Sequence, residues 1–134
     1  MTQTKILLLE NVHPIATDKL KDAGFHVVNE SASLSEADIL KVIQNFDVLG
    51  IRSKTNLSSS FFEKAQHLLT VGAFCIGTNQ IDLVKSNKVG IPVFNAPYSN
   101  TRSVAEMVIG QMISLSRNLG DRNMQAHQGK WNKS

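Results

Sequence analysis

Two cations and a hydroxyl stand in succession at Arg52, Ser53 and Lys54, directly after an apolar run that ends at Ile51. Guanidinium and ammonium groups bind carboxylates and phosphates, and arginine can grip either through two parallel hydrogen bonds. Thr55 adds a second hydroxyl. The pattern predicts a clamp for a small anion, and a solvated loop is the alternative that the residues leave open.

A glycine-rich segment at residues 72–80 (GAFCIGTNQ) is the second place where chemistry could occur. It nearly fits the phosphate loop G-x-x-x-x-G-K-[ST], but Thr78 stands where that loop carries its lysine, so a nucleoside triphosphate site is rejected. Glycine lets the backbone approach a ligand closely, and a plain turn at a strand end is the alternative. Cys75 has no histidine beside it in the sequence, which favours a buried, inert thiol.

The third candidate is the polar segment 95–103, which leads into a strongly apolar helical pattern. Helix N-termini present free N–H groups to anions, so Asn100 and Ser103 are either ligand contacts or plain caps. Arg102 in the first turn opposes the helix dipole, which predicts an anionic partner, either Glu106 or a ligand.

The elements that must position these segments alternate between apolar runs and helical patterns. Strands are expected at 5–9, 25–28, 47–51, 69–75 and 91–95, and helices at 13–23, from 35 onward, at about 60–67 and at 82–88. Ser60-x-x-Glu63 is a capping-box pattern for the third helix. Apolar strands that alternate with helices predict a flavodoxin-like, doubly wound parallel sheet covered on both faces, in which ligands bind beyond the carboxyl ends of the strands.

Residues 100–134 depart from this alternation. Ser103-x-x-Glu106 is another capping box, and the apolar residues that follow line two stripes of one helix. A helix that is apolar over so wide a face needs cover on more than one side, and the polar stretch 120–134, with its single Trp131, does not supply it. We therefore expect two parts, 1–99 and 100–134, and an interrupted arrangement in which missing structure or a partner subunit covers the helix.

Composition and charge exclude several classes of protein. No apolar run approaches the roughly 20 residues of a membrane helix, and the single cysteine permits no disulfide framework, which predicts a cytoplasmic location. The first 50 residues carry four basic and seven acidic side chains, whereas residues 51–134 carry ten and four, which favours an anionic small ligand. Without a block of like charges, nucleic acid is not expected as a partner. Four histidines without metal-ligand spacing are interpreted as surface residues: His13, His26, His67 and His127.

Four stretches, in order and in spacing, resemble the bacterial-type D-3-phosphoglycerate dehydrogenases, a branch of the D-2-hydroxyacid dehydrogenases. These stretches are IRSKT at 51–55, GAFCIGTNQID at 72–82, GIPVFNAPYSNTRSVAE at 90–106 and AHQGKWNK at 126–133. The resemblance implies oxidation of 3-phosphoglycerate to 3-phosphohydroxypyruvate with NAD, in the pathway to L-serine, by a homo-oligomer. It also implies a substrate-binding domain at 1–99, followed at 100–134 by the interdomain helix and the start of a nucleotide-binding domain.

The resemblance further implies roles for individual residues. It assigns substrate binding to Arg52, Ser53, Lys54, Gly77 and Asn100, and contact with NAD to Thr78 and Val104. Lys54 stands where these enzymes often carry arginine, so a charge remains but a two-pronged grip does not. The family's catalytic arginine, glutamate and histidine and its G-x-G-x-x-G have no counterpart here, so no catalytic residue and no metal site is assigned. The 134 residues alone are expected to be inactive.

Two rival functions come from other classes of protein. A catalytically inactive anion-binding or regulatory module of the same fold would bind 3-phosphoglycerate without turning it over. A receiver-type signalling domain shares the topology, but it needs paired acids after the first strand, an aspartate after the third and a lysine after the fifth. Those places hold Glu10-Asn11, Arg52 and Asn95-Ala96, which excludes a receiver.

Overall fold

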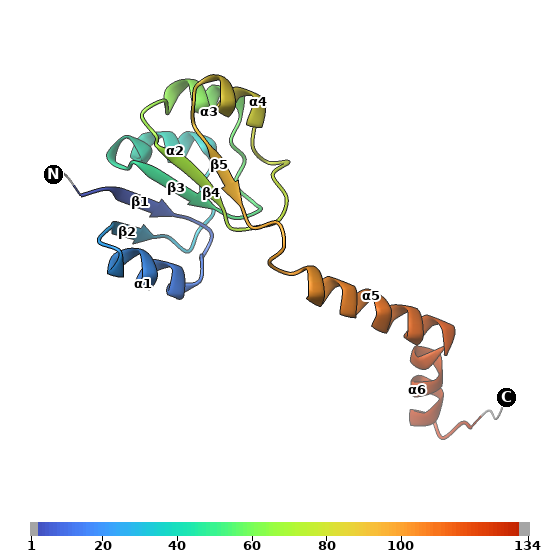
Figure 1. The fold of residues 1–134 in the computed structure, drawn as a ribbon. Helices are drawn as coiled ribbons and strands as arrows, with labels where there is room; N and C mark the ends of the chain where they lie inside the picture. Colours follow the sequence, from blue (N-terminus) through green and yellow to red (C-terminus); the bar gives the residue numbers. More distant parts are fainter. Residues whose placement is uncertain (1–2, 132–134) are drawn as a thin grey trace. The chain divides into compact units, whose positions relative to one another are not determined.

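The computed structural model describes residues 3–131, which divide into two compact units, Met1–Ser99 and Asn100–Ser134. The first unit is built on one parallel sheet of five strands in the order β2-β1-β3-β4-β5 (Figure 1). This order confirms the predicted flavodoxin-like, doubly wound topology. The strands are β1 (Lys5–Leu8), β2 (His26–Asn29), β3 (Val48–Ile51), β4 (Thr70–Ala73) and β5 (Val93–Asn95).

Four helices and one short 3-10 turn connect these strands. Figure 1 shows α1 on one face of the sheet, with α2, α3 and α4 on the other. Their bounds are α1 (Pro14–Asp22), α2 (Glu36–Val42), the 3-10 turn η1 (Ile43–Asn45), α3 (Ser59–Lys64) and α4 (Leu83–Lys88). No helix among residues 3–131 is long and apolar enough to cross a membrane.

The hydrophobic core lies on both faces of the sheet because apolar side chains of β1 alternate between them. Leu7 belongs to the larger cluster, which α2 and α3 cover with Ile39 and Phe61. Ile6 and Leu8 belong to the smaller cluster, against which α1 packs. A strand that is apolar at every position therefore contributes to two cores at once, as expected for a buried parallel strand.

The start of α3 differs from the capping box predicted at Ser60. The helix begins at Ser59, its N-cap Ser58 makes no side-chain cap bond, and Ser60 lies inside the helix. The hydroxyls of Ser58 and Ser60 instead donate to the carboxylate of Glu36 on α2, at 2.9 and 2.8 Å, and the Ser58 N–H donates at 2.8 Å. The predicted box is wrong because a carboxylate distant in sequence takes both hydroxyls.

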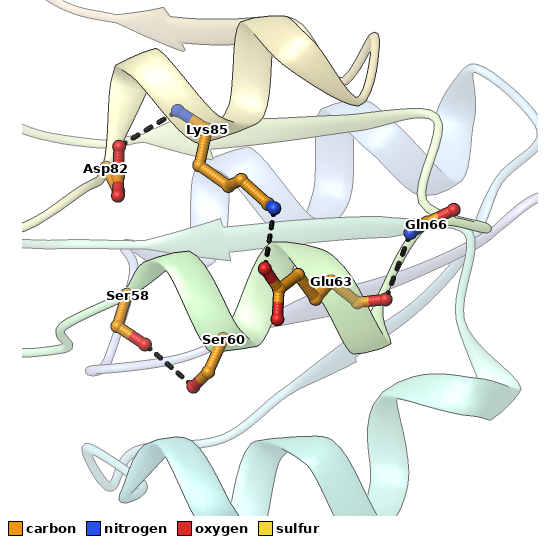
Figure 2. Close-up of polar contacts among 6 residues, drawn as sticks. All are labelled: Ser58, Ser60, Glu63, Gln66, Asp82 and Lys85. Carbon is orange, nitrogen blue, oxygen red and sulfur yellow. Dashed lines mark hydrogen bonds and ion pairs between the residues drawn. The ribbon is translucent and has the colours of Figure 1, made fainter.

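The acidic residue of that predicted box joins α3 to α4 instead. Glu63 accepts a 2.6 Å ion pair from Lys85, and the Lys85 N–H donates to the carboxylate of Asp82, the N-cap of α4 (Figure 2). Asp82 caps α4, and the sequence predicted the start of this helix at the same residue. The ion pair is partly exposed, so its contribution is expected in the usual range of about 0–1 kcal/mol for surface pairs.

The second unit consists of two helices, α5 (Thr101–Ser116) and α6 (Leu119–His127). The N-cap of α5 is Asn100, which makes no side-chain cap bond, and Ser103 lies within the first turn, so the capping box predicted there is wrong. Glu106 instead pairs with Arg102 at 2.7 Å, which is one of the two partners predicted for that arginine. No residue of α5 is buried within the described structure.

Helix α6 was not predicted, because residues 120–134 were interpreted only as a polar tail. Asn118 adopts a left-handed backbone conformation with φ of 49°, which ends α5 and redirects the chain into α6. Asparagine tolerates this conformation better than most residues. The polar composition of α6 does not oppose helix formation, since Gln, Met, Ala and Arg all have good helix propensity.

Candidate functional site

A pocket of about 280 Å³ lies at the carboxyl edge of the sheet. The loops that follow β1, β2 and β3 form its walls. Its lining residues are Glu10, Asn11, Ser31, Ser33, Arg52, Ser53 and Lys54. The structure thus brings the predicted anion-binding triplet together in one hollow, where ligands of open α/β sheets bind.

Glu10 organises the loop that carries this triplet. Its Oε1 accepts the N–H of Arg52 at 3.0 Å and that of Thr55 at 2.9 Å, and its Oε2 accepts the N–H of Lys54 at 2.9 Å. Glu10 is only 7% exposed and has a left-handed backbone with φ of 63°. That conformation costs about 1–2 kcal/mol for a residue with a Cβ atom, which three hydrogen bonds to a carboxylate outweigh.

The hydrogen bonds also set the charge of Glu10. Burial alone would raise the pKa of this carboxyl, but the Thr55 side chain and the N–H groups of Lys54, Thr55 and Arg52 together hold the pKa below its usual value. The Thr55 hydroxyl interacts with the carboxylate electrostatically, although among the described residues it has no partner at full hydrogen-bond geometry. Glu10 is therefore ionised at neutral pH.

This arrangement decides how the loop can bind an anion. The N–H groups of Arg52, Lys54 and Thr55 are occupied by Glu10. The Thr55 hydroxyl is buried and Thr55 does not line the pocket, so the second hydroxyl of the predicted clamp does not reach it. The exposed side chains of Arg52, Ser53 and Lys54 remain. A ligand in the pocket can therefore contact the cations of Arg52 and Lys54 and the hydroxyl of Ser53.

A second polar group joins this loop to the turn after β4. The Nε2 of Gln80 donates to the carbonyl oxygen of Arg52 at 3.0 Å and to Sγ of Cys75 at 3.3 Å. The Cys75 thiol donates to the carbonyl oxygen of Gly77 at 3.2 Å. Cys75 is only half-buried, not the buried thiol predicted from the sequence. Gly77 and the half-buried Thr78 thus follow a strand next to that of the triplet.

The remaining predicted residues lie elsewhere. Asn100 and Val104 belong to the second unit, at the start of α5, and are not among the residues that line the pocket. Sequence reasoning missed Glu10 and Gln80 as members of the site. Their signal was weak: Glu10 ends an apolar strand, and Gln80 lies within the glycine-rich segment, but neither position shows which backbone groups its side chain would reach.

A metal site is not apparent in the described structure. Among residues 3–131, no group of three or more His, Cys, Asp or Glu side chains could hold a metal ion.

Acid is expected to destabilise the first unit through two carboxylates, Glu10 and Glu36, whose pKa is lowered in the folded state. The pKa of Glu36 is also lowered, because burial, which raises it, is outweighed by hydrogen bonds from Ser58 and Ser60 and by the charge of Lys64. A lowered pKa in the folded state stabilises the protein fully above the unfolded pKa of about 4.3 and loses that contribution as the pH falls through the folded pKa. Urea unfolding at pH 7 and pH 3.5 measures the loss.

The contribution of Glu10 to this acid sensitivity can be separated with a variant. Glu10→Gln is expected to reduce the difference in unfolding free energy between the two pH values, whereas Glu30→Gln leaves it unchanged because Glu30 is exposed and holds no loop. An equal pH dependence in Glu10→Gln and the unmodified chain would show that Glu10 is not held as a buried anion.

Comparisons with known proteins agree with this fold. Residues 6–127 match the family described as D-isomer specific 2-hydroxyacid dehydrogenase, catalytic domain. The D-3-phosphoglycerate dehydrogenase 2 of Saccharomyces cerevisiae is 50% identical over 96% of this chain, and the D-3-phosphoglycerate dehydrogenase of Escherichia coli K12 is 45% identical over 96%. The chain spans only 27% and 32% of the lengths of these two relatives.

A solved structure of D-2-hydroxyisocaproate dehydrogenase has the same fold, with a TM-score of 0.76 and 22% identity over 94% of this chain and 39% of its own. The family match extends over most of the sequence and includes both the pocket and the turn after β4. The chain therefore belongs to the family of D-isomer specific 2-hydroxyacid dehydrogenases.

Proposed function

We propose that this chain is the substrate-binding portion of an NAD-dependent oxidoreductase that converts 3-phosphoglycerate to 3-phosphohydroxypyruvate in L-serine biosynthesis. One observation carries the proposal: Arg52, Ser53 and Lys54 line a single pocket at the carboxyl edge of the sheet. The similarity to two D-3-phosphoglycerate dehydrogenases supports the choice of substrate. A cytoplasmic homo-oligomer is part of the same proposal.

The chemistry of the pocket suits a small molecule with two anionic ends. The planar guanidinium of Arg52 can bind a carboxylate or phosphate through paired hydrogen bonds, whereas Lys54 acts as a movable point charge. The hydroxyl of Ser53 adds a donor between them in sequence. Glu10 keeps the main chain of the loop fixed and reduces the excess positive charge, so binding depends on side chains carried by a fixed loop.

The two units correspond to the proposed domains. Met1–Ser99 would be the substrate-binding domain, and Asn100–Ser134 would hold the interdomain helix and the start of a nucleotide-binding domain. On this assignment the exposed apolar side chains of α5 would be covered by the further domain or by a partner subunit.

NAD is not expected to be held by these residues alone. The sequence contains no G-x-G-x-x-G, whose glycines let a dinucleotide approach the start of a helix. Thr78 and Val104 are proposed to contact the cofactor, and they belong to separate units. Most NAD contacts would come from the part of the longer relatives that this chain does not match, and the 134 residues alone would produce no NADH.

Removing both pocket cations tests the site. The variant Arg52→Gln/Lys54→Gln is expected to bind 3-phosphoglycerate at least about 100-fold more weakly, since each charged hydrogen bond contributes about 1.5–3 kcal/mol. Isothermal titration calorimetry at constant ionic strength measures the change. The matched control is Lys19→Gln/Lys21→Gln, which removes two exposed cations of α1 outside the pocket and is expected to bind normally. Equal binding by both double variants would contradict the site.

The alternative is an inactive anion-binding or regulatory module of the same fold, for which the pocket lined by Arg52, Ser53 and Lys54 is sufficient. Both functions predict binding through the same pocket. The intact mass of the product made from its native gene distinguishes them, because the oxidoreductase requires a chain about three times longer, whereas the module requires one of 134 residues.

A further inference from the structure

A buried amide connects two parts of the site that belong to different loops. Gln80 is 9% exposed, and its Nε2 donates to the carbonyl oxygen of Arg52 at 3.0 Å and to Sγ of Cys75 at 3.3 Å. The main chain of Gln80 is fixed as well, because its carbonyl oxygen accepts the N–H of Leu57 at 2.9 Å. The main chain of Gln80 is therefore fixed, and its side-chain amide lies between the loop that carries Arg52 and the turn that carries Cys75.

The chain of hydrogen bonds continues through the thiol. Cys75 accepts from Gln80 and donates in turn to the carbonyl oxygen of Gly77 at 3.2 Å. Linked hydrogen bonds in a partly buried environment polarise one another and behave as a unit. Arg52, which carries a pocket cation, is thus joined to Gly77 by three successive hydrogen bonds through two side chains.

We propose that Gln80 is a positioning residue that transmits anion binding at residues 52–54 to the turn at Gly77 and Thr78. This inference rests on the proposed function, because it requires an anion in the pocket. When the Arg52 side chain binds the anion, any adjustment of its main chain changes the bond from Gln80 to the Arg52 carbonyl, and the change passes through Cys75 to Gly77. The same link fixes the spacing between the two loops for a ligand that contacts both.

The variant Gln80→Met isolates this link because it keeps the size of the side chain and removes both donors. Inorganic phosphate is titrated into the full chain, and backbone amide signals are followed by ¹H–¹⁵N NMR. In the unmodified chain, signals at residues 52–54 and at Gly77 and Thr78 are expected to move together. In Gln80→Met, movement at 52–54 is expected to persist, whereas movement at Gly77 is lost.

The matched control is Gln66→Met. Gln66 is exposed, and its amide donates to the carbonyl oxygen of Glu63 in α3 (Figure 2). It is not among the residues that line the pocket. This variant is expected to respond to phosphate as the unmodified chain does, which separates loss of the Gln80 link from a general effect of replacing glutamine.

Equal movement of the Gly77 signal in Gln80→Met and in the unmodified chain overturns the inference and leaves the proposed function standing. No movement at residues 52–54 in the unmodified chain contradicts the proposed function, and the inference falls with it.

Should Gln80→Met fail to fold, the variant Cys75→Ala provides the test, because it breaks only the hydrogen bonds made by the thiol. Its expected result is a normal response at 52–54 with a reduced response at Gly77, and an unchanged Gly77 response overturns the inference.

Discussion

Replacing Glu10 by alanine is expected to lower the free energy of unfolding by about 3 kcal/mol, because each unsatisfied buried donor costs about 1–3 kcal/mol. The carboxylate accepts the N–H groups of Arg52, Lys54 and Thr55, and alanine offers no acceptor in its place. The bonds from Arg52 and Lys54 are only partly buried, which keeps the cost below the sum for three buried donors. Urea unfolding at pH 7 measures the effect.

Two further variants separate the causes. Glu10→Gly removes the same acceptor but relieves the left-handed backbone at φ of 63°, so it is expected to be less destabilising than Glu10→Ala by about 1 kcal/mol. Glu30→Ala is the control, since this exposed glutamate is expected to change stability by no more than about 0.5 kcal/mol. A loss in Glu10→Ala no larger than the loss in the control would contradict the role assigned to the carboxylate.

The largest loss of stability is expected from Phe61→Ala, at about 3–5 kcal/mol, because the substitution leaves a cavity in the core. Phe61 is fully buried on α3 and packs edge-to-face with Phe62, with ring centroids 5.4 Å apart and planes at 86°. Truncation removes both the buried area and this aromatic contact. Chemical denaturation followed by circular dichroism measures the change.

The control for this substitution is Phe94→Ala, which removes a ring that is 64% exposed on β5. Its expected effect on stability is below about 1 kcal/mol, since little of the ring leaves water on folding. Similar losses of stability in the two variants would contradict the packing of α3 against the larger hydrophobic cluster.

Apolar runs predicted much of the fold because the inner strands β1 and β3 are buried on both faces. β1 is apolar at Ile6, Leu7 and Leu8, and these side chains enter two different cores. All five strands and the first four helices occur where the sequence placed them, within a few residues. Helix α6 escaped prediction because residues 120–134 are mostly polar and were interpreted as a tail.

Capping boxes were the weakest local predictions. Ser60 and Ser103 had the right spacing from an acidic residue, yet each lies inside its helix. A capping-box pattern takes account only of residues close in sequence. The Ser60 hydroxyl donates instead to the carboxylate of Glu36, which is distant in sequence, at 2.8 Å. Tertiary hydrogen bonds of this kind leave no local signal.

The site was predictable only where function requires exposed charge. Arg52 and Lys54 follow a buried strand, so the topology alone places them at the ligand edge of the sheet. Glu10 and Gln80 act by reaching backbone groups of another loop, and such contacts depend on loop conformation rather than on residue spacing. Whether Gly77, Thr78, Asn100 and Val104 contact substrate or NAD stays a prediction.

Binding of 3-phosphoglycerate to the 134-residue chain tests the central claim most directly. The affinity is measured by calorimetry for the unmodified chain and for Arg52→Gln/Lys54→Gln, with Lys19→Gln/Lys21→Gln as the control. The predicted result is saturable binding that only the pocket variant loses, by about 100-fold or more. Absence of binding in the unmodified chain, or equal binding in both double variants, would contradict the claim that this pocket receives the substrate.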